Sequence, residues 1–183
     1  VISIDCGVKE GYTDTTRIQY QDDDIQFGQI HTISSNNSLN YQSQIRKQLI
    51  SLRSFPDGKR NCYTLKPKQG KNNRYIVRSY YAYGNYDNKH KPPTFDLYID
   101  VTNFTLIRFT VADTTRRVEA IYFSLTDTID FCLVNIDQGI PFISLLELWP
   151  LANTAIYQHS LTFQTLDLLT RVTLGVSTTD ELL

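Results

Sequence analysis

The chain of 183 residues is predicted to be an all-β domain, and three features of its sequence support this. Residues 95–101 alternate strictly between apolar side chains and aspartate or tyrosine, which is the period of a half-buried strand. Turn-forming groups of Pro, Gly, Asn and Asp recur at short intervals. No segment keeps a long helical period. Short strands at this spacing indicate a β-sandwich or a jelly roll.

Each expected strand is a short run of β-branched and aromatic residues bounded by turn signals. In chain order the expected strands are 1–6, 61–65, 75–83, 95–101, 105–111, 118–123, 131–136 and 142–148. The turns that separate the later strands are expected at 56–58, 69–70, 84–85, 92–93, 139 and 141. The alternation places Val101 on the same face as Phe95, and it places Phe109 and Val111 on the same face as Ile107. Residues 42–52 have apolar spacing that suits a helix, but we expect a strand or irregular structure there.

Composition and missing motifs argue against an enzyme. The chain is 41% hydrophobic and 20% charged, as in ordinary globular proteins, and its net charge of −1 does not suggest a nucleic-acid partner. No apolar run approaches the ~18 residues of a membrane span. The sequence has no GxSxG, P-loop, GxGxxG or HExxH motif, so we expect no catalytic residue and no cofactor. No metal site is expected, and Asp22-Asp23-Asp24 is interpreted as an acidic surface turn rather than a calcium loop.

Basic residues are concentrated in the middle of the chain. Residues 46–91 hold 12 of the 18 Lys and Arg residues but only two of the 19 Asp and Glu residues. The favoured interpretation is that these side chains are solvated and salt-bridged to the acidic remainder. If they share one face, they instead form a field that steers a charged partner.

Residues 80–88 contain four tyrosines around a Gly-Asn turn, and they supply most of the candidate ligand-binding residues. A tyrosine combines a flat apolar face with a hydroxyl, so such a loop suits a sugar, a peptide or a protein surface. Tyr81 is expected in the core. The candidates in this loop are Tyr83, Asn85, Tyr86 and Asp87.

Cysteine count and glycosylation sequons fit an extracellular protein. Cys6, Cys62 and Cys132 are an odd number, and we expect Cys62 to pair with Cys132. A bridge from Cys6 to Cys132 or to a cysteine outside the chain, or three reduced cysteines, are the alternatives. The sequons Asn36-Asn37-Ser38 and Asn103-Phe104-Thr105 predict glycans at Asn36 and Asn103, the first in a polar loop and the second at a turn.

Several phrases in order along residues 1–151 resemble the malectin-like domain of plant receptor-like kinases that also carry leucine-rich repeats. They lie at 2–7 (Ile-Ser-Ile-Asp-Cys-Gly), 12–14, 52–65, 75–78, 83–87, 93–98, 132–135 and 141–151. The resemblance implies a malectin-like β-sandwich of the galactose-binding-like jelly-roll type. It also implies display outside the plant cell, ahead of a membrane span and a kinase, and a role in recognition rather than catalysis.

The same resemblance bears on the ligand. Animal malectin binds a diglucoside through loop aromatics and an aspartate, and residues 83–87 are the nearest equivalent in position. Relatives tend to have Thr-Gly where this chain has Ile136-Asp137, which changes a loop at the edge of the sandwich. Asp137 is therefore a fifth candidate for ligand binding.

The resemblance also divides the chain. Residues 1–156 are expected to form one malectin-like module, and residues 157–183 are expected to be a linker and the first strand of a second, truncated module. The run at 168–176 echoes the opening of the chain, and Val1 is not a translation start, so we expect a piece of a longer ectodomain.

Two functions from different classes follow. The favoured hypothesis is an extracellular module that binds a peptide or a co-receptor protein at the cell surface. The alternative is a carbohydrate-binding module that recognises cell-wall or glucose-type oligosaccharides. In both cases the membrane is reached only through a segment outside this chain.

Overall fold

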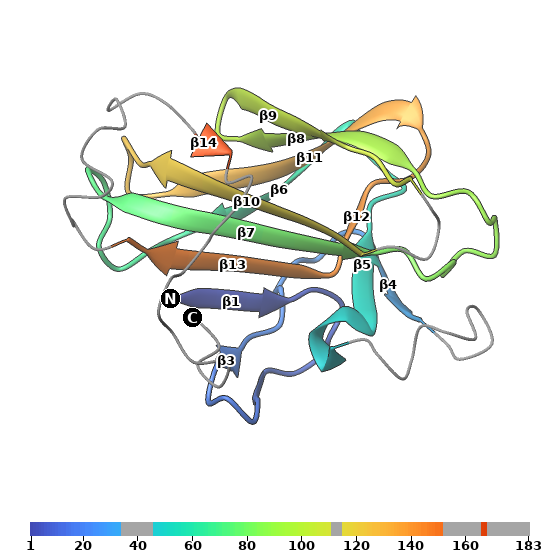
Figure 1. Cartoon of the computed structure of the whole chain (residues 1–183), viewed down its shortest axis with the longest axis horizontal. Coiled ribbons are helices and arrows are strands. Elements are labelled where there is room, and N and C mark those ends of the chain that lie inside the picture. The colour runs from blue at the N-terminus through green and yellow to red at the C-terminus, as the bar shows by residue number, and fades with distance from the viewer. Residues whose placement is uncertain (34–45, 111–114, 152–165, 168–183) are drawn as a thin grey trace, which may run out of the picture.

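Two antiparallel sheets pack face to face and enclose the hydrophobic core (Figure 1). The computed structural model describes residues 1–33, 46–110, 115–151 and 166–167. The strands are β1 Ile2–Asp5, β2 Tyr12–Thr13, β3 Gln19–Tyr20, β4 Gln29–Thr32, β5 Ser51–Ser54, β6 Arg60–Leu65, β7 Arg74–Ala82, β8 Thr94–Ile99, β9 Thr102–Ile107, β10 Thr115–Phe123, β11 Ile129–Gln138, β12 Phe142–Ile143, β13 Leu145–Pro150 and β14 Leu166–Asp167. A single 3₁₀ turn, η1 Lys47–Leu49, is the one helical element in the described residues. The all-β prediction is confirmed.

The strand order places two edge strands on the same side of the sandwich. The larger sheet runs β1-β13-β7-β10-β14 and the smaller runs β6-β11-β8-β9. A three-stranded sheet, β12-β5-β4, closes one end, and β2 and β3 form a hairpin below β1 (Figure 1). Strands β1 and β6 are therefore the terminal strands of their sheets, and residues of both line one cleft described below.

Side-chain alternation along β7 and β8 explains how the core forms. Tyr75, Val77 and Tyr81 of β7 and Phe95 and Leu97 of β8 are at most 2% exposed. These side chains come from alternate positions of opposing sheets, as sandwich packing requires. Tyr81 lies in the core as expected.

The hairpin of β8 and β9 differs from the prediction. Strand β8 ends at Ile99, and Asp100 adopts a positive φ of 51° in a two-residue turn with Val101. The turn is fixed because the Asp100 backbone N–H donates to the Asp130 carbonyl (2.7 Å) and the Asp100 carboxylate accepts from the Asp130 N–H (2.7 Å). Val101 is 92% exposed, so its predicted inward position is wrong. Strand β9 begins at once and ends at Ile107, which leaves Phe109 beyond it; Val111 lies outside the described residues.

The single strand expected at 142–148 is two strands in different sheets. Ser144 separates β12 from β13. Its N–H donates to the Tyr80 carbonyl (2.9 Å), its carbonyl accepts from the Cys6 N–H (2.9 Å), and its hydroxyl accepts from the Ala82 N–H (3.1 Å). These bonds hold the chain where it passes from one sheet to the next. The 42–52 segment is η1 followed by β5 where it is described, so a strand is correct from Ser51 onward.

Two arginines of the basic segment pair with acids from outside it, as expected, but their contacts are buried rather than solvated. Arg78 bonds Glu119 on β10 (2.6 Å) and Glu147 on β13 (3.3 Å), with side-chain exposures of 12%, 3% and 5%. Arg53 pairs with Asp23, and both side chains are less than 10% exposed. The predicted solvation of these two arginines is therefore wrong, because strand packing covers them.

The cysteines adopt the expected arrangement. Cys62 on β6 lies directly opposite Cys132 on β11, and a disulfide joins them with a Cα–Cα distance of 4.0 Å. Cys6 is a buried free cysteine.

Candidate functional site

The loop that follows β7 holds four of the sequence-predicted ligand residues, and it is bonded largely to itself. Tyr83 is fully buried, and its hydroxyl donates to the Asp87 carboxylate. Asn85 is 3% exposed, and its side-chain oxygen accepts from the His90 N–H at 2.8 Å. Burial, followed by the hydrogen bond to Asp87, raises the pKa of Tyr83. Tyr83 and Asn85 thus shape the loop from inside, and only the outer part of the loop faces solvent.

Tyr86 is the half-buried member of this loop, and it packs against other rings. Its ring centroid lies 4.6 Å from that of His31, 5.6 Å from that of Tyr83 and 5.6 Å from that of Phe142. Tyr86 and Asp87 are each partly exposed. A ligand at this loop therefore meets one partly covered ring beside a carboxylate rather than an open platform of tyrosines.

Asp137 stands apart from the other four candidates. It is exposed, has a positive φ of 62°, and lies in a β-bulge of β11 between Asn135 and Gln138. Its N–H donates to the Asn135 side chain at 2.8 Å. Within the described ranges, no hydrogen bond joins its carboxylate to the tyrosine loop.

Of the two predicted glycosylation sites, Asn103 lies in the described part of the chain and Asn36 does not. Asn103 is exposed near the start of β9, just after the hairpin turn, and its side-chain nitrogen lies 3.4 Å from an Asp96 carboxylate oxygen. It lies in the strand rather than in the turn where it was expected. Asn36 lies outside the described residues.

A cleft that the sequence did not reveal opens along the side of the sandwich. This lateral cleft has a volume of about 460 Å³ and lies between β1, the 21–25 segment and the outer edge of β6. It is lined by Ile2, Ile4, Gln21, Asp22, Asp23, Asp24, Ile25, Cys62, Tyr63, Thr64, Leu65 and Lys66. A smaller hollow of about 260 Å³ shares Ile2, Gln21 and Lys66 with it and extends toward Lys68.

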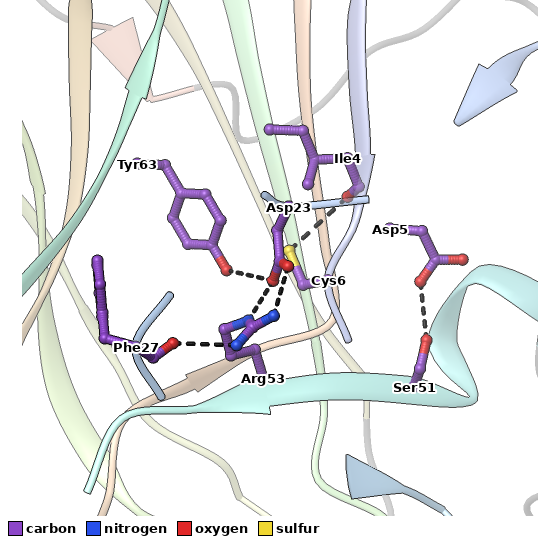
Figure 2. Close-up of polar contacts among 8 residues, drawn as sticks. All are labelled: Ile4, Asp5, Cys6, Asp23, Phe27, Ser51, Arg53 and Tyr63. Atoms are coloured by element: carbon purple, nitrogen blue, oxygen red, sulfur yellow. Dashed lines mark hydrogen bonds and ion pairs between the residues drawn. The ribbon is translucent and has the colours of Figure 1, made fainter. Parts of the chain in front are cut away.

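Asp23 and Tyr63, which line the lateral cleft, belong to a fixed polar group with Arg53 (Figure 2). Arg53 on β5 contacts Asp23 through two nitrogens, with Nη2 donating to Oδ1 at 2.6 Å, and its Nη1 donates to the Phe27 carbonyl at 3.0 Å. The Tyr63 hydroxyl donates to Asp23 at 3.3 Å. The Asp23 side chain is only 2% exposed, so the interpretation of Asp22-Asp23-Asp24 as a surface turn is wrong for its middle residue.

The pKa shifts of this group favour the charged form of Arg53 and the neutral forms of Cys6 and Tyr63. Burial opposes the charge on Arg53, but the bonds to Asp23 outweigh it and raise the pKa of Arg53. Burial raises the pKa of the Cys6 thiol and of the Tyr63 hydroxyl well above their ordinary values. A thiol kept protonated and fully buried is not a nucleophile.

Neither a metal centre nor a membrane helix is found in the described part of the chain. There, no group of three or more His, Cys, Asp or Glu side chains is placed to hold a metal ion. Within the same residues, no helix has the length and apolarity needed to cross a membrane.

Comparison with known proteins gives the family. A profile of the Malectin-like domain matches residues 4–182. The chain belongs to the malectin-like domain family. A putative leucine-rich repeat receptor-like serine/threonine-protein kinase of Arabidopsis thaliana is 40% identical to this malectin-like domain over 157 residues, and a probable kinase of the same class and organism is 39% identical over 155 residues.

Both alignments cover 83% of this malectin-like domain but only 18% of the relative. The chain thus spans less than a fifth of the length of these curated relatives. Their leucine-rich repeat and kinase names describe proteins that are much longer than the part matched here.

Solved structures share the fold of this malectin-like domain. The ANX2 ectodomain of Arabidopsis thaliana superimposes with a TM-score of 0.63 at 16% identity over 82% of this chain and 42% of that chain. A second neighbour comes from a crystal structure of the plant peptide RALF23 in complex with FER and LLG2, with a TM-score of 0.66 at 10% identity over 82% of this chain and 48% of that one. At these identities the likeness shows the fold alone.

The lateral cleft of this malectin-like domain could not be foreseen from the sequence, for a physical reason. Asp22 and Thr64 are more than forty positions apart in the sequence. They line the same cleft only because β1 and β6 lie at the same side of the sandwich. The run Asp22-Asp23-Asp24 was the one local feature of the sequence that marked this cleft. The sequence did not show that Asp23 pairs with Arg53, because Arg53 is thirty residues away.

Proposed function

We propose that this malectin-like domain is the extracellular recognition module of a plant receptor-like kinase and that it binds a peptide or a protein partner. The observation that carries the proposal is the lateral cleft, which lies beside a sheet edge and is lined by both apolar and charged side chains. Family membership and the receptor-kinase names of the relatives support the cell-surface setting.

The site chemistry supports binding rather than catalysis. The best-buried carboxylate of the cleft, Asp23, is held by Arg53, and the nearby Cys6 thiol is sealed from solvent. Neither group is available as a nucleophile or as a general base. The cleft offers a surface with fixed polar groups, which suits recognition.

One solved neighbour gives independent support for this class of ligand. That crystal structure contains a plant peptide, RALF23, in complex with FER and LLG2. The peptide is a property of that complex, and here it supports only the proposal that a malectin-like fold serves peptide recognition.

A carbohydrate remains the second candidate because of Tyr86 and Asp87. A partly exposed aromatic ring beside a carboxylate suits a sugar ring, and both residues are partly exposed. The burial of Tyr83 and Asn85 removes two of the four expected contacts from the surface, which favours the peptide hypothesis.

The test uses the 183-residue chain secreted from eukaryotic cells. It is immobilised and exposed in parallel to a library of synthetic secreted-type peptides and to a plant glycan array. We expect saturable peptide binding and no glycan signal. A glycan signal that Tyr86→Ala abolishes, with no peptide hit, would overturn the proposal in favour of sugar recognition.

A further inference from the structure

We propose that the outer edge of β6 is a β-augmentation site, at which an extended peptide pairs with Cys62 and Thr64 and places a basic side chain beside Asp22 and Asp24. This inference rests on the proposed peptide-binding function and names the binding mode. It concerns the lateral cleft and not the tyrosine loop.

The disulfide reveals which backbone groups of β6 are free. In antiparallel sheets, opposed residues alternate between hydrogen-bonded pairs with Cα atoms about 5.5 Å apart and non-hydrogen-bonded pairs at about 4.5 Å. Cys62 and Cys132 oppose one another at 4.0 Å, so they form a non-hydrogen-bonded pair. The N–H and C=O of Cys62 therefore point away from β11 and toward the lateral cleft. Thr64, two residues further along β6, has the same orientation.

These outward groups have no partner in the described part of the chain. Strand β6 is the terminal strand of its sheet, and β11 is its one strand neighbour there. The backbone bonds outside the regular ladders include none to residues 61–65. A row of unpaired donors and acceptors is the template that β-augmentation uses.

On the opposite wall of the cleft, the backbone groups of Gln21 are already hydrogen-bonded to β1. The Gln21 N–H donates to the Ser3 carbonyl (2.9 Å), and its carbonyl accepts from the Asp5 N–H (3.0 Å). The 21–25 segment is thus held to β1 and leaves the edge of β6 open. The volume of about 460 Å³ between them lies beside an edge six residues long.

Charge identifies the occupant. Asp23 is neutralised by Arg53, whereas Asp22 and Asp24 line the same cleft and form no ion pair in the described ranges. Lys66, exposed at the far end of β6, makes that end repulsive to a cation. A peptide with a basic side chain opposite Asp22 and Asp24 matches this pattern, and its apolar side chains meet the half-buried Ile2 and Ile25.

The flanks of β6 disfavour a second copy of this chain as the occupant. Arg60 and Lys66 are exposed at its two ends. In the antiparallel register centred on Tyr63, two such edges would bring Arg60 of one copy opposite Lys66 of the other, and like charges directly opposed are destabilising. Positive charges on an edge are a known protection against self-pairing.

The first experiment is hydrogen exchange, read residue by residue by NMR. In the free chain the amides of Cys62 and Thr64 are expected to exchange quickly, and those of Asn61, Tyr63 and Leu65 slowly because β11 holds them. The probes are two blocked octapeptides of alternating Val and Thr, each with one Arg near one end, to cover both orientations. One of them is expected to bind and to protect Cys62 and Thr64 selectively.

Modified probes and variants isolate the backbone and charge contributions. N-methylation of alternate probe residues removes the donors that pair with β6 and is expected to weaken binding about tenfold or more. Replacing Arg in the probe by Glu, or Asp22→Asn with Asp24→Asn in the protein, is expected to weaken it about fivefold. Thr64→Pro removes an outward N–H, which an edge strand tolerates, and should abolish binding; Thr64→Ala is the matched control that keeps it.

The outcomes are distinct. Slow exchange of the Cys62 and Thr64 amides in the free chain overturns the inference. This measurement does not require the Thr64→Pro variant to fold. Binding that protects residues 86–90 instead also overturns the inference, although it leaves the proposed peptide function standing. Concentration-dependent dimerisation through β6, blocked by Thr64→Pro, would assign the edge to a second copy and also overturn it.

Discussion

The Asp23 carboxylate and the Arg53 guanidinium form a buried bidentate ion pair beside the lateral cleft. Asp23 follows β3 and Arg53 lies on β5, so the pair ties the N-terminal segment to the sheet at the end of the sandwich. Tyr63 adds a third bond from β6. The contact thus joins three parts of the chain at one carboxylate (Figure 2).

Removing one partner of this pair is expected to be costly. Asp23→Ala leaves Arg53 buried without its counter-charge, and breaking such a pair typically lowers the free energy of unfolding by about 3–5 kcal/mol. Urea denaturation followed by tryptophan fluorescence measures the loss. Asp24→Ala, the exposed neighbour, is the matched control, with an expected change within about 0.5 kcal/mol. Equal effects of the two substitutions would contradict the role assigned to Asp23.

Asp5 makes stability depend on pH. Burial raises the pKa of Asp5 from 3.8 to about 6, although its carboxylate accepts hydrogen bonds from Tyr12 (2.5 Å) and Ser51 (2.8 Å). The folded chain therefore binds this proton more tightly than the unfolded chain. The contribution of Asp5 to stability is complete below pH 3.8 and is lost as the pH rises to about 6. The loss amounts to roughly 3 kcal/mol.

Urea midpoints measured between about pH 4 and pH 7 check this prediction. Asp5→Asn carries no titrating group and is expected to flatten the fall in stability over that range. Asp57→Asn, an exposed carboxylate away from this cluster, is expected to leave the fall unchanged. An unaltered pH profile in Asp5→Asn would show that another group is responsible.

The Cys62–Cys132 disulfide is expected to stabilise the domain. It closes a loop with a sequence separation of 70, for which the chain-entropy model gives about 4 kcal/mol. The double variant Cys62→Ala, Cys132→Ala should lose stability of that order. In the unmodified chain a thiol reagent should label one cysteine, Cys6, only after unfolding. Labelling of native Cys6, or of more than one thiol after unfolding without reductant, would contradict the assignment.

Asn103 is exposed and is expected to carry a glycan when the chain is secreted. Intact mass before and after enzymatic deglycosylation, compared between the wild type and Asn103→Gln, measures its occupancy. The variant should lose one glycan mass. Asn36→Gln tests the other sequon independently. A mass for Asn103→Gln that differs from the wild type by the amino-acid change alone would refute glycosylation at Asn103.

Local pattern was enough to predict the strands that cross the core. The alternation from Phe95 to Ile99 follows from backbone geometry, since successive side chains of a strand face opposite sides. The prediction failed at Val101 because two backbone and side-chain bonds to Asp130 turn the chain at Asp100. That partner lies thirty residues away, and no local pattern reports it.

In the candidate site, too, local pattern predicted some features, and contacts with distant residues decided others. The aromatic richness of the loop after β7 was visible, but the burial of Tyr83 depends on Phe142 and Asp87 being placed around it. For the 157–183 segment, interpreted as a second module, residues other than Leu166–Asp167 lie outside the described residues. That interpretation stays a prediction.

The all-β class and the malectin-like family could be predicted from the sequence, because strand period and family motifs are local properties of the chain. The pairing of Cys62 with Cys132 was an expectation with open alternatives, and the structure decided between them. Tertiary structure alone decided that Asp23 is a buried partner of Arg53 and that the edge of β6 faces an open cleft. Both depend on which strands become neighbours when two sheets close around one core. Burial and edge exposure are set by that closure, and residues far apart in the sequence acquire their roles only there.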